Sequence, residues 1–367
     1  MHIVFDARFY GLEHTGIGRY VTNVLRELES DTVNTYTLLL TKKYMNAPFP
    51  PEWRRVEASA PHYSAKEQWE IPKLIRSLHP DLVHFPHFNV PFVVPAPYVV
   101  TIHDLLMHRF SGFSATTLSP LAYIGKRMAY KGVFRHAVTA AAKIIVPTEF
   151  VKEDLLNHYP SLNTQKITVL YEGVDMPKMI APVAKTTKKH GIVGEYVIYV
   201  GNAYPHKNLE RAIEAFHHAM IDKPATFVIV TGRNVFYERL KKYLKTHPAK
   251  NKVQVLGFVE DSELYALYKG AKAFLYPSLF EGFGLPGLEA LSVGCPVIAS
   301  DIPVFREVYK NAVNYFNPEN VSSMARAITT AMNGHDIPSA SHRNALLARY
   351  SWKTHGEKTQ AVYTAVK

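Results

Sequence analysis

Strand-like and helix-like segments alternate along most of this chain, and the alternation limits its fold more than any other feature. Short apolar runs at 2–8, 36–42 and 196–202 have the length and composition of buried strands. Longer segments at 17–29 and 208–220 carry apolar residues at helical spacing. Strands that alternate with helices of this length form βαβ units around parallel sheets. The sequence therefore predicts an α/β protein.

The alternation runs twice, and a stretch of different composition separates the two runs. Residues 176–194 contain two prolines, two glycines and a basic cluster without a long apolar face, which is typical of a linker. We expect one Rossmann-like domain over residues 1–175 and a second over 195–350. Residues 351–367 are expected to form a C-terminal helix, capped by Ser351, that could cross back to the N-terminal domain.

Cysteine use and the absence of export signals favour a cytoplasmic protein. The 367-residue chain has one cysteine, Cys295, so no intrachain disulfide can form, which fits a reducing compartment. Met1 leads directly into the first predicted strand without a secretory signal. The longest stretch without a charged side chain, 82–103, contains four prolines, so we expect buried strands and loops there instead of a membrane-spanning helix.

The chain is basic, which favours a phosphate-bearing partner. Forty-two Lys and Arg against thirty-one Asp and Glu give a net charge of +11. Nucleotides, nucleic acids and anionic lipids all fit such a charge. No zinc finger, arginine-rich run or RNP motif is present, so we expect no nucleic-acid partner. The alternative interpretation is that most of this charge is solvated surface.

Two glycine-containing loops after predicted strands are candidate anion sites. Gly16 lies between the first predicted strand and helix, where backbone amides could meet a diphosphate, although a plain turn explains it equally well. Lys207 follows the strand that ends at Gly201 and stands just before a helix, which forms a compact cationic site. The alternative for Lys207 is a surface lysine beside a helix cap formed by Asn208.

A histidine ends another predicted strand. His103 and Asp104 close the segment Tyr98 to Asp104. Ligands of open parallel sheets bind beyond the carboxyl ends of the strands, so His103 could hydrogen-bond a substrate hydroxyl. A purely structural histidine is the alternative.

Two glutamates flank a Gly- and Pro-rich kink. Glu281 belongs to a predicted loop, and Glu289 belongs to a short helix that begins near Leu285 with Pro286 in its first turn. Carboxylates bind sugar hydroxyls through charge-assisted hydrogen bonds. Two solvated glutamates are the alternative, which the specific Gly/Pro pattern between them disfavours.

Several catalytic motifs are absent from the sequence. It contains no D-x-D pair, H-E-x-x-H, CxxC, G-x-S-x-G or P-loop pattern. We therefore expect no cofactor, no required metal ion and no serine nucleophile. Phosphates would be neutralised by lysines, arginines and helix ends.

The segment EGFGLPGLEALSVGCPVIAS resembles the E-x7-E signature of retaining glycosyltransferases of the GT-B fold, in glycosyltransferase family 4 (group 1). The segments TGIGRYVTNVL, TIHDL and VGNAYPHKNL resemble this family's glycine loop, His-Asp strand end and phosphate-contacting loop. Matched segments run from about Phe5 to about Val308 in the order that the family has. The resemblance implies two Rossmann-like domains whose parallel sheets face each other across a cleft.

The resemblance also implies roles for individual residues. Glu281 would face the donor sugar and Glu289 the ribose, while Lys207 would meet the diphosphate. His103 would contact the sugar from the other domain. Asn202 occupies a position that is often arginine in the family, so one positive charge is missing there. The remaining donor-binding positions implied are Gly16, Gly257, Phe258, Phe283, Gly284 and Leu285.

By the same resemblance, the protein is expected to be a metal-independent, retaining hexosyltransferase that uses a nucleotide sugar. GDP-mannose is the favoured donor, with UDP-sugars next, and the acceptor would be a glycan or a lipid-linked glycan of a cell-surface polysaccharide. The N-terminal domain, 1–175, would bind the acceptor, and the C-terminal domain, 195–350, the nucleotide sugar. The alternatives are a nucleotide-sugar epimerase or a phosphorylase of the same fold, and a non-catalytic protein that binds nucleotide sugars.

A basic segment could serve the acceptor or a membrane. Residues 121–137 place four cationic side chains among aromatic and apolar ones. Such a segment could lie on an anionic membrane surface, at the inner face of the membrane, or guide a lipid-linked acceptor. An ordinary basic helix packed on the sheet is the alternative. The four residues are Lys126, Arg127, Lys131 and Arg135.

Overall fold

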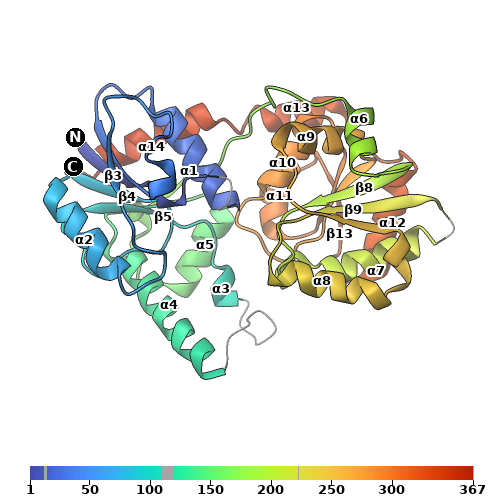
Figure 1. Ribbon diagram of the computed structural model, residues 1–367, viewed down its shortest axis with the longest axis horizontal. Coiled ribbons are helices and arrows are strands. Elements are labelled where there is room, and N and C mark those ends of the chain that lie inside the picture. Colours follow the sequence, from blue (N-terminus) through green and yellow to red (C-terminus); the bar gives the residue numbers. More distant parts are fainter. Residues whose placement is uncertain (12–14, 110–119, 222, 367) are drawn as a thin grey trace. The chain divides into compact units, whose positions relative to one another are not determined.

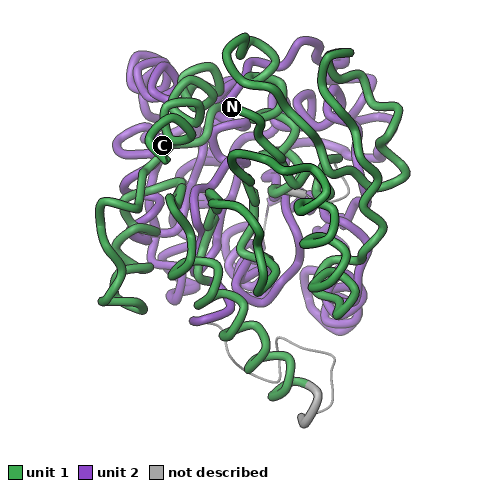
Figure 2. Tube along the Cα trace, turned by 90° about the vertical axis from the view of Figure 1, so that its left-hand side faces the viewer, with its two compact units in different colours: residues 1–105, 116–173, 351–367 green, residues 106–115, 174–350 purple. Residues whose placement is uncertain are grey.

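The computed structural model describes residues 1–11, 15–109, 120–221 and 223–366. They form two compact units, each built around its own sheet (Figures 1 and 2). Unit 1 consists of residues 1–105, 116–173 and 351–367. Unit 2 consists of residues 106–115 and 174–350.

The sheet of unit 1 has seven parallel strands in the order β3-β2-β1-β4-β5-β6-β7. In chain order, the strands are β1 (His2–Asp6), β2 (Thr35–Leu40), β3 (Arg54–Glu57), β4 (Leu82–Phe85), β5 (Tyr98–Thr101), β6 (Lys143–Val146) and β7 (Ile167–Val169). Phe5 of β1 pairs with His84 of β4 in the middle of this sheet. The α/β prediction is confirmed, and so are the buried strands expected within 82–103.

Helices cover both faces of the unit 1 sheet. Its helices are α1 (Thr15–Leu28), α2 (Glu67–Leu78), α4 (Pro120–Ala140), α5 (Glu149–His158) and α14 (Trp352–Thr364). On one face α2, α4 and α5 complete a core with Val83 and Val100. Successive strand residues point to opposite faces, so His84 meets α14 on the other face, where α14 lies beside α1 (Figure 1). Short 3-10 turns are η1 (Ala7–Phe9), η3 (Lys42–Tyr44) and η5 (Thr164–Lys166).

The sheet of unit 2 has six parallel strands in the order β10-β9-β8-β11-β12-β13. Their bounds are β8 (Glu195–Val200), β9 (Ala225–Val230), β10 (Val253–Leu256), β11 (Ala273–Tyr276), β12 (Val297–Ser300) and β13 (Asn314–Phe316). The central strands β8 and β11 consist almost entirely of buried residues, as expected of a parallel sheet covered on both faces.

Unit 2 has its own set of helices, most of which follow its strands in the chain. They are α3 (Leu106–Arg109), α6 (Val183–Lys189), α7 (Leu209–Ala219), α8 (Val235–Thr246), α9 (Asp261–Gly270), α10 (Leu285–Ser292), α11 (Pro303–Tyr309), α12 (Val321–Met332) and α13 (Ala340–Leu347), with η6 (Pro205–Lys207) and η7 (Pro248–Asn251). On one face α7, α8 and α12 form a core with Phe227 and Leu275.

Residues 176–194, which have the composition of a linker, include the helix α6. The backbone of Ala181 donates to the carbonyl of Ser262 at 3.1 Å. Lys189 and His190 at the end of α6 both bind Glu263 of α9, at 2.5 and 3.0 Å. The segment is therefore docked on unit 2 by polar contacts that its own apolar pattern does not reveal. At the other end of the chain, Ser351 caps α14 through the amide of Thr354, as predicted.

Candidate functional site

The strand order of unit 2 reverses between β8 and β11. The chain adds β9 and β10 on one side of β8 and then β11, β12 and β13 on the other. In open parallel sheets the ligand crevice lies outside the carboxyl ends of the strands at such a switch point. The carboxyl ends of β8 and β11 lead into residues 201–208 and 277–284, which contain five of the predicted site residues, Lys207 and Glu281 among them.

Lys207 and Glu281 come from these two loops and form an ion pair with an Nζ–Oε1 distance of 2.5 Å. Ser278 Oγ donates to the same carboxylate oxygen at 2.7 Å. The lysine and glutamate side chains are 16% and 12% exposed, so solvent still reaches both. Either charge can therefore exchange its partner for a ligand group without a change in the core.

Buried tyrosines support the Glu281 loop. Three lie close to its charge: Tyr199, Tyr276 and Tyr309. Burial, and secondarily the Glu281 carboxylate, raise the pKa of each hydroxyl well above its ordinary value. Each therefore keeps its proton at neutral pH and can donate it in a hydrogen bond. Tyr199 donates to the carbonyl of Asn202 at 2.8 Å, and Tyr309 to that of Gly284.

Helix α10 begins at Leu285 with Pro286 in its first turn, as predicted. Gly284 precedes it with a φ of 111°, in the left-handed region that favours glycine. A Cβ at this position would lie 2.5 Å from the Tyr309 hydroxyl, so packing also requires glycine. Because glycine has no side chain to cap the helix, the first-turn amides of α10 are suited to an anion.

Two further predicted residues of this segment, Phe283 and Glu289, are almost fully buried. Phe283 is 4% exposed, and its ring packs edge-on against Tyr350 at a centroid distance of 5.5 Å. Only the backbone of Phe283 is therefore suited to a ligand. Glu289 lies in α10 and is 7% exposed. The protein therefore covers most of this carboxylate.

Polar residues also gather at the carboxyl ends of β8, β9 and β10. The amide oxygen of Asn202 lies 3.7 Å from a Cβ built on Gly232. Arg233 Nε lies 3.4 Å from a Cβ built on Gly257, so the guanidinium rests against this glycine. Phe258 follows Gly257 and is 66% exposed. The predicted positions Asn202, Gly257 and Phe258 thus belong to two loops, and each loop lies beside the loop of Gly232 and Arg233.

Arg233 is a residue that sequence reasoning does not single out. Asn202 leaves a positive charge missing in the expected pattern, and Arg233 supplies one at the end of the adjacent strand β9. Its position immediately after a predicted strand is the signal that could have identified it. The contact with Gly257 depends on the pairing of β9 with β10, which the sequence does not specify.

His103 lies after β5 at the carboxyl edge of the unit 1 sheet, and both of its ring nitrogens have protein partners. Nε2 lies 2.9 Å from the carbonyl oxygen of Pro86, to which it must donate because a carbonyl only accepts. Nδ1 lies 3.5 Å from the carboxylate of Glu172. The Tyr20 ring packs edge-on against the imidazole at 4.6 Å. These contacts hold the ring in one orientation.

Gly16 lies inside the first turn of α1, because the helix begins at Thr15, and not in a loop before the helix as expected. The first-turn amides of a helix lack intrahelical partners, so an anion site remains compatible with this position. A Cβ on Gly16 would meet no atom of the described residues within 4 Å. Internal packing therefore does not require glycine here. Residues 12–14, just before the helix, lie outside the described residues.

The predicted basic segment 121–137 lies within one helix, α4. Its C-terminal half packs into the unit 1 core through Phe134 and Val138. In the other half Ile124 and Met128 are 50% and 70% exposed, and α4 extends away from the sheet there (Figure 1). Arg127 donates to the Tyr123 hydroxyl at 3.5 Å and is half-buried. The exposed cationic residues are Lys126, Lys131 and Arg135.

Three further features of the described residues concern metal binding, membrane insertion and the single cysteine. Among them, no three His, Cys, Asp or Glu side chains converge as they would around a metal ion. No helix in the described ranges is both long and apolar enough to cross a bilayer. Cys295 is buried, and burial raises the pKa of its thiol, which makes it a poor nucleophile.

Comparison with known proteins identifies the family. The Glycosyltransferase Family 4 model matches residues 14–177, and the Glycosyl transferases group 1 model matches residues 184–346. The O-antigen chain mannosyltransferase RfbU of Salmonella typhimurium is 30% identical over 280 residues, which are 76% of this chain and 72% of that protein. The chain belongs to the group 1 glycosyltransferases of family 4.

Other relatives of this glycosyltransferase differ in name and length. A glycogen synthase of Mycobacterium tuberculosis is 27% identical over 308 residues, 80% of this chain and 70% of that protein. The serotype-specific mannosyltransferase WbdA of Escherichia coli is 25% identical over 402 residues. That alignment covers 96% of this chain but only 46% of WbdA, which is the longer protein.

Solved structures share the fold of the glycosyltransferase at low sequence identity. Sucrose-phosphate synthase from Thermosynechococcus elongatus matches with a TM-score of 0.76 at 17% identity, over 100% of this chain and 99% of that one. Anabaena Alr3699/HepE in complex with UDP and glucose matches with a TM-score of 0.75 at 16% identity, over 100% of both chains. The predicted GT-B fold, with two Rossmann-like parallel sheets, is confirmed.

Proposed function

We propose that this glycosyltransferase is a retaining hexosyltransferase that takes a hexose from a nucleotide sugar. Mannose is the favoured hexose and GDP-mannose the favoured donor, with UDP-sugars next. The name of the Salmonella relative supports mannose and the synthesis of a cell-surface polysaccharide such as lipopolysaccharide. The glycogen synthase relative and the neighbour with bound UDP and glucose support glucose and UDP as the competing choice. The acceptor is a glycan or a lipid-linked glycan.

The observation that carries this proposal is the Lys207–Glu281 pair at the switch point of unit 2. A nucleotide sugar presents a negative diphosphate next to a hydroxyl-rich ring, and the pair offers one partner to each. Lys207 would turn to the diphosphate, while Glu281 would stay held by Ser278 and accept hydrogen bonds from the sugar. The first-turn amides of α10 would add partial positive charge near the phosphate.

The reaction then needs little covalent chemistry from the protein. The bond from the anomeric carbon to the diphosphate oxygen breaks, and a bond to the acceptor oxygen forms on the same face. The departing diphosphate oxygen takes the acceptor's proton. Lys207, Arg233 and the α10 amides would stabilise the charge that develops on the leaving group, and such electrostatic stabilisation often contributes most to the rate acceleration of an enzyme.

The remaining residues divide between the two ends of the donor. Glu289 would bind the ribose hydroxyls, and the exposed loop of Gly257 and Phe258 would meet the base. From unit 1, Gly16 would approach the diphosphate and His103 the sugar. Because both His103 nitrogens already have protein partners, His103 would have to exchange one of these partners for a sugar hydroxyl.

A donor panel tests the proposal. The purified protein is given GDP-mannose, UDP-glucose, UDP-galactose and UDP-N-acetylglucosamine, and released nucleoside diphosphate is measured. We expect release from one donor, the same rate in excess EDTA, and retention of the anomeric configuration in the product by NMR. Activity that EDTA removes and a divalent metal restores would contradict the metal-independent mechanism.

A matched pair of variants tests the ion pair. Lys207→Ala should lower kcat by about 10²-fold or more, because one cation at the leaving group is lost. Lys189→Ala removes an ion pair of the same 2.5 Å length on the α6–α9 surface and should leave kcat unchanged. Equal rates for the two variants would show that Lys207 does not act on the leaving group.

The same assay separates the alternative functions. An epimerase would convert one nucleotide sugar into another without releasing the diphosphate. A phosphorylase would consume inorganic phosphate when it cleaves a glycan. A non-catalytic protein would bind the donor, with no turnover for any acceptor. Each outcome has a different product, which chromatography of the reaction mixture resolves.

We also propose that α4 brings the protein to the inner face of an anionic membrane, where lipid-linked acceptors reside. The sequence from Leu105 to Thr148 contains no Asp or Glu but six Lys and Arg. In the exposed half of α4, cationic side chains alternate with exposed Ile124 and Met128. Interfacial helices combine these two features.

Vesicle sedimentation tests the membrane proposal. The protein should sediment with phosphatidylglycerol vesicles but not with phosphatidylcholine vesicles, and high salt should release it. A triple variant in which Lys126, Lys131 and Arg135 are replaced by Gln should lose this binding. Equal binding to both kinds of vesicle would contradict the electrostatic mechanism.

A further inference from the structure

Glu172 is a buried carboxylate that the proposed mechanism leaves unused. It lies in the loop after β7, in unit 1, and is 5% exposed. Sequence reasoning does not single it out. A carboxylate removed from water needs an opposite charge or several hydrogen-bond donors, because burial strongly disfavours an isolated charge. The partners of Glu172 therefore indicate its role.

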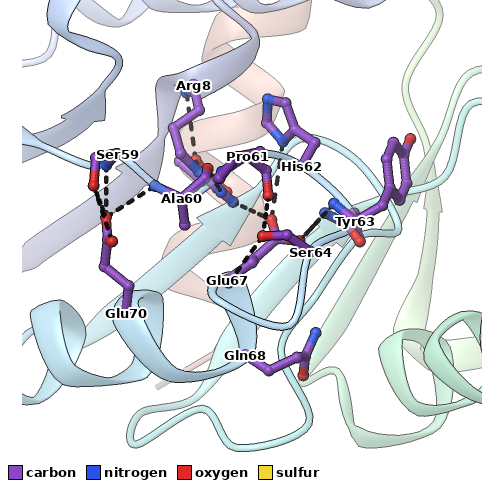
Figure 3. Close-up of polar contacts among 12 residues, drawn as sticks. Arg8, Ser59, Ala60, Pro61, His62, Tyr63, Ser64, Glu67, Gln68 and Glu70 are labelled. Carbon is purple, nitrogen blue, oxygen red and sulfur yellow. Dashed lines mark hydrogen bonds and ion pairs between the residues drawn. The ribbon is translucent and has the colours of Figure 1, made fainter.

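Another buried carboxylate of unit 1, that of Glu67, is fully compensated (Figure 3). Its Oε1 accepts from Arg8 Nη2 at 2.6 Å. Its Oε2 accepts from the backbone amide of Tyr63 at 2.9 Å and from the side-chain amide of Asn89 at 2.6 Å. Both oxygens of Glu67 thus have close donors, and the Arg8 guanidinium compensates the charge.

Glu172 has a single close charged partner among the described residues, the imidazole of His103. Its Oε1 lies 3.5 Å from His103 Nδ1. The hydroxyl of Tyr20 and the imidazole of His355 are also close to its charge, but their hydrogen bonds go to other groups. The compensation of the buried Glu172 carboxylate therefore depends on His103.

The two contacts of His103 differ in kind. Nε2 lies 2.9 Å from the carbonyl oxygen of Pro86 and donates to it. Nδ1 faces a carboxylate, which only accepts, so this nitrogen binds Glu172 when it carries a proton. The contact with Pro86 is a hydrogen bond to a neutral group, whereas the contact with Glu172 compensates a buried charge.

A sugar hydroxyl that binds His103 has to replace one of these two partners. Replacing Glu172 would leave a buried carboxylate without its charged partner, which is strongly destabilising. Replacing Pro86 would free a neutral carbonyl, and the loss of that hydrogen bond costs much less. The His103 side chain is 16% exposed, so a ligand can reach it. Nε2 is therefore the nitrogen that can exchange its partner.

We propose that Glu172 is a positioning residue for donor binding: it holds His103 by Nδ1, so that Nε2 exchanges the Pro86 carbonyl for a hydroxyl of the donor sugar. The inference rests on the proposed function, in which His103 contacts the sugar of a nucleotide sugar. Glu172 does not touch the donor and acts only through the imidazole. The Tyr20 ring, edge-on to the imidazole at 4.6 Å, supports the same orientation.

This arrangement suits a hydroxyl group. With a proton on Nδ1 held by Glu172, Nε2 accepts the hydroxyl proton if the ring is neutral. If the ring is protonated on both nitrogens, Nε2 donates to the hydroxyl oxygen instead. A hydroxyl fits both states because it donates and accepts, and in both states Glu172 fixes the direction of Nε2.

The chain offers a matched control for the loss of a buried carboxylate beside a histidine. Asp154 in α5 is 1% exposed, and its Oδ1 lies 3.6 Å from His158 Nδ1. This pair resembles that of Glu172 and His103 in burial and distance, but both of its members belong to one helix. Asp154→Asn should therefore leave donor binding unchanged.

Calorimetry on the full chain without an acceptor tests the proposal. The probes are GDP-mannose with GDP and UDP-glucose with UDP. For the nucleotide sugar that binds the wild type, Glu172→Ala should weaken the affinity about tenfold, because an oriented hydrogen bond to the sugar is lost. The affinity of this variant for the nucleoside diphosphate should stay within twofold. Asp154→Asn should leave both affinities within twofold.

A double variant separates positioning from an independent contribution. If Glu172 acts through His103, the variant that combines Glu172→Ala with His103→Ala should bind the nucleotide sugar as tightly as His103→Ala alone. Independent contributions would multiply, and the double variant would then bind about tenfold more weakly than His103→Ala. Glu172→Gln should lose less affinity than Glu172→Ala, since its amide oxygen still accepts from Nδ1.

The outcomes separate this inference from the proposed function. Unchanged nucleotide-sugar affinity in Glu172→Ala, an equal loss for the nucleoside diphosphate, or a multiplicative loss in the double variant would overturn the positioning role. If the expected pattern of binding appears but no donor releases its diphosphate in the donor panel, only the transferase function fails. If neither nucleotide sugar binds the wild type, both fail.

Melting temperatures of the variants, compared with the wild type, identify losses through unfolding. Glu172→Gln keeps the shape of the side chain, so it replaces Glu172→Ala if the latter does not fold. A folded Glu172→Gln variant should then bind the nucleotide sugar more weakly and the nucleoside diphosphate as before. Wild-type affinity for the nucleotide sugar in that variant would overturn the positioning role.

Discussion

At the scale of single residues, the candidate donor site consists of charges held by their neighbours. Glu281 has a hydrogen bond from Ser278 in addition to its ion pair with Lys207. Its carboxylate therefore keeps its position when Lys207 moves to a phosphate. This preorganisation means that substitution of Glu281 should affect the chemical step more than donor binding.

Glu281→Gln tests that argument. The amide keeps the shape of the side chain but loses its charge, so we expect kcat to fall by about 10²-fold or more while donor KM changes little. Steady-state release of nucleoside diphosphate measures both constants. A variant with wild-type kcat, shown by circular dichroism to be folded, would remove Glu281 from the mechanism.

Gly16→Ala distinguishes a binding glycine from a structural one. The position lies in a helix with open space around it, so alanine should leave the free energy of unfolding unchanged or raise it by up to about 1 kcal/mol. If Gly16 admits the diphosphate, donor KM should rise several-fold in the same variant. If donor KM and the free energy of unfolding both stayed unchanged, Gly16 would be neither a binding glycine nor a structural one.

At the scale of elements, close approach of backbones explains glycines that the helical pattern alone would disfavour. The Cβ of a residue at Gly356 in α14 would lie 2.5 Å from the Cβ of Glu27 in α1. Outside the helices, a Cβ at Gly173 would lie 2.2 Å from the backbone nitrogen of Trp352. At Gly356, α14 and α1 thus pack at a distance that only glycine permits. A hydrogen-bond chain through Tyr363, His84, Thr101, Tyr20 and His355 adds polar contacts between them and the sheet.

Gly356→Ala should therefore destabilise the protein, although alanine is the better helix former. The added methyl group meets the base of another side chain, and we expect the free energy of unfolding to fall by about 1–3 kcal/mol. Gly125→Ala in α4 is the matched control. No atom of the described residues lies within 4 Å of a Cβ there, so this variant should gain up to about 1 kcal/mol. Urea unfolding measures both, and a stabilised Gly356→Ala variant would contradict the packing argument.

At the scale of the whole molecule, buried neutral histidines make stability depend on pH. Three lie in unit 1: His84, His87 and His355. Burial is the main cause that lowers the pKa of each, and it lowers that of His84 to about 3. The folded state therefore takes up these protons at lower pH than the unfolded chain, which takes them up near pH 6.5.

The free energy of unfolding should accordingly change little between about pH 7.5 and pH 8 and fall as the pH drops below 6.5. His84 alone should remove about 1.4 kcal/mol between pH 8 and pH 5.5, because the unfolded state is by then mostly protonated at this residue. Urea unfolding at a series of pH values measures the slope. His335→Gln, at an exposed position, should leave the curve unchanged. A flat profile from pH 8 to pH 5.5 would contradict the neutral state of these histidines.

Most elements, and the Lys207 and Glu281 part of the candidate site, could be predicted from local sequence. Apolar periodicity indicated the principal strands, and Pro286 with the glycines beside it indicated where α10 begins. The rule that ligands meet the carboxyl ends of strands pointed to Lys207 and Glu281, whose ion pair the structure shows. The short strands β3 and β13 and the helix α6 were not predicted, because three to seven residues carry too little periodicity to be recognised.

The tertiary structure alone decided the contacts between residues far apart in the chain. Arg233 reaches Gly257 because β9 and β10 pair, and Lys207 reaches Glu281 because β8 and β11 pair. The sequence by itself determined the α/β alternation and the residues at strand ends, since these depend on local periodicity and turn chemistry. Which strand ends lie side by side depends on strand order, which no local pattern encodes.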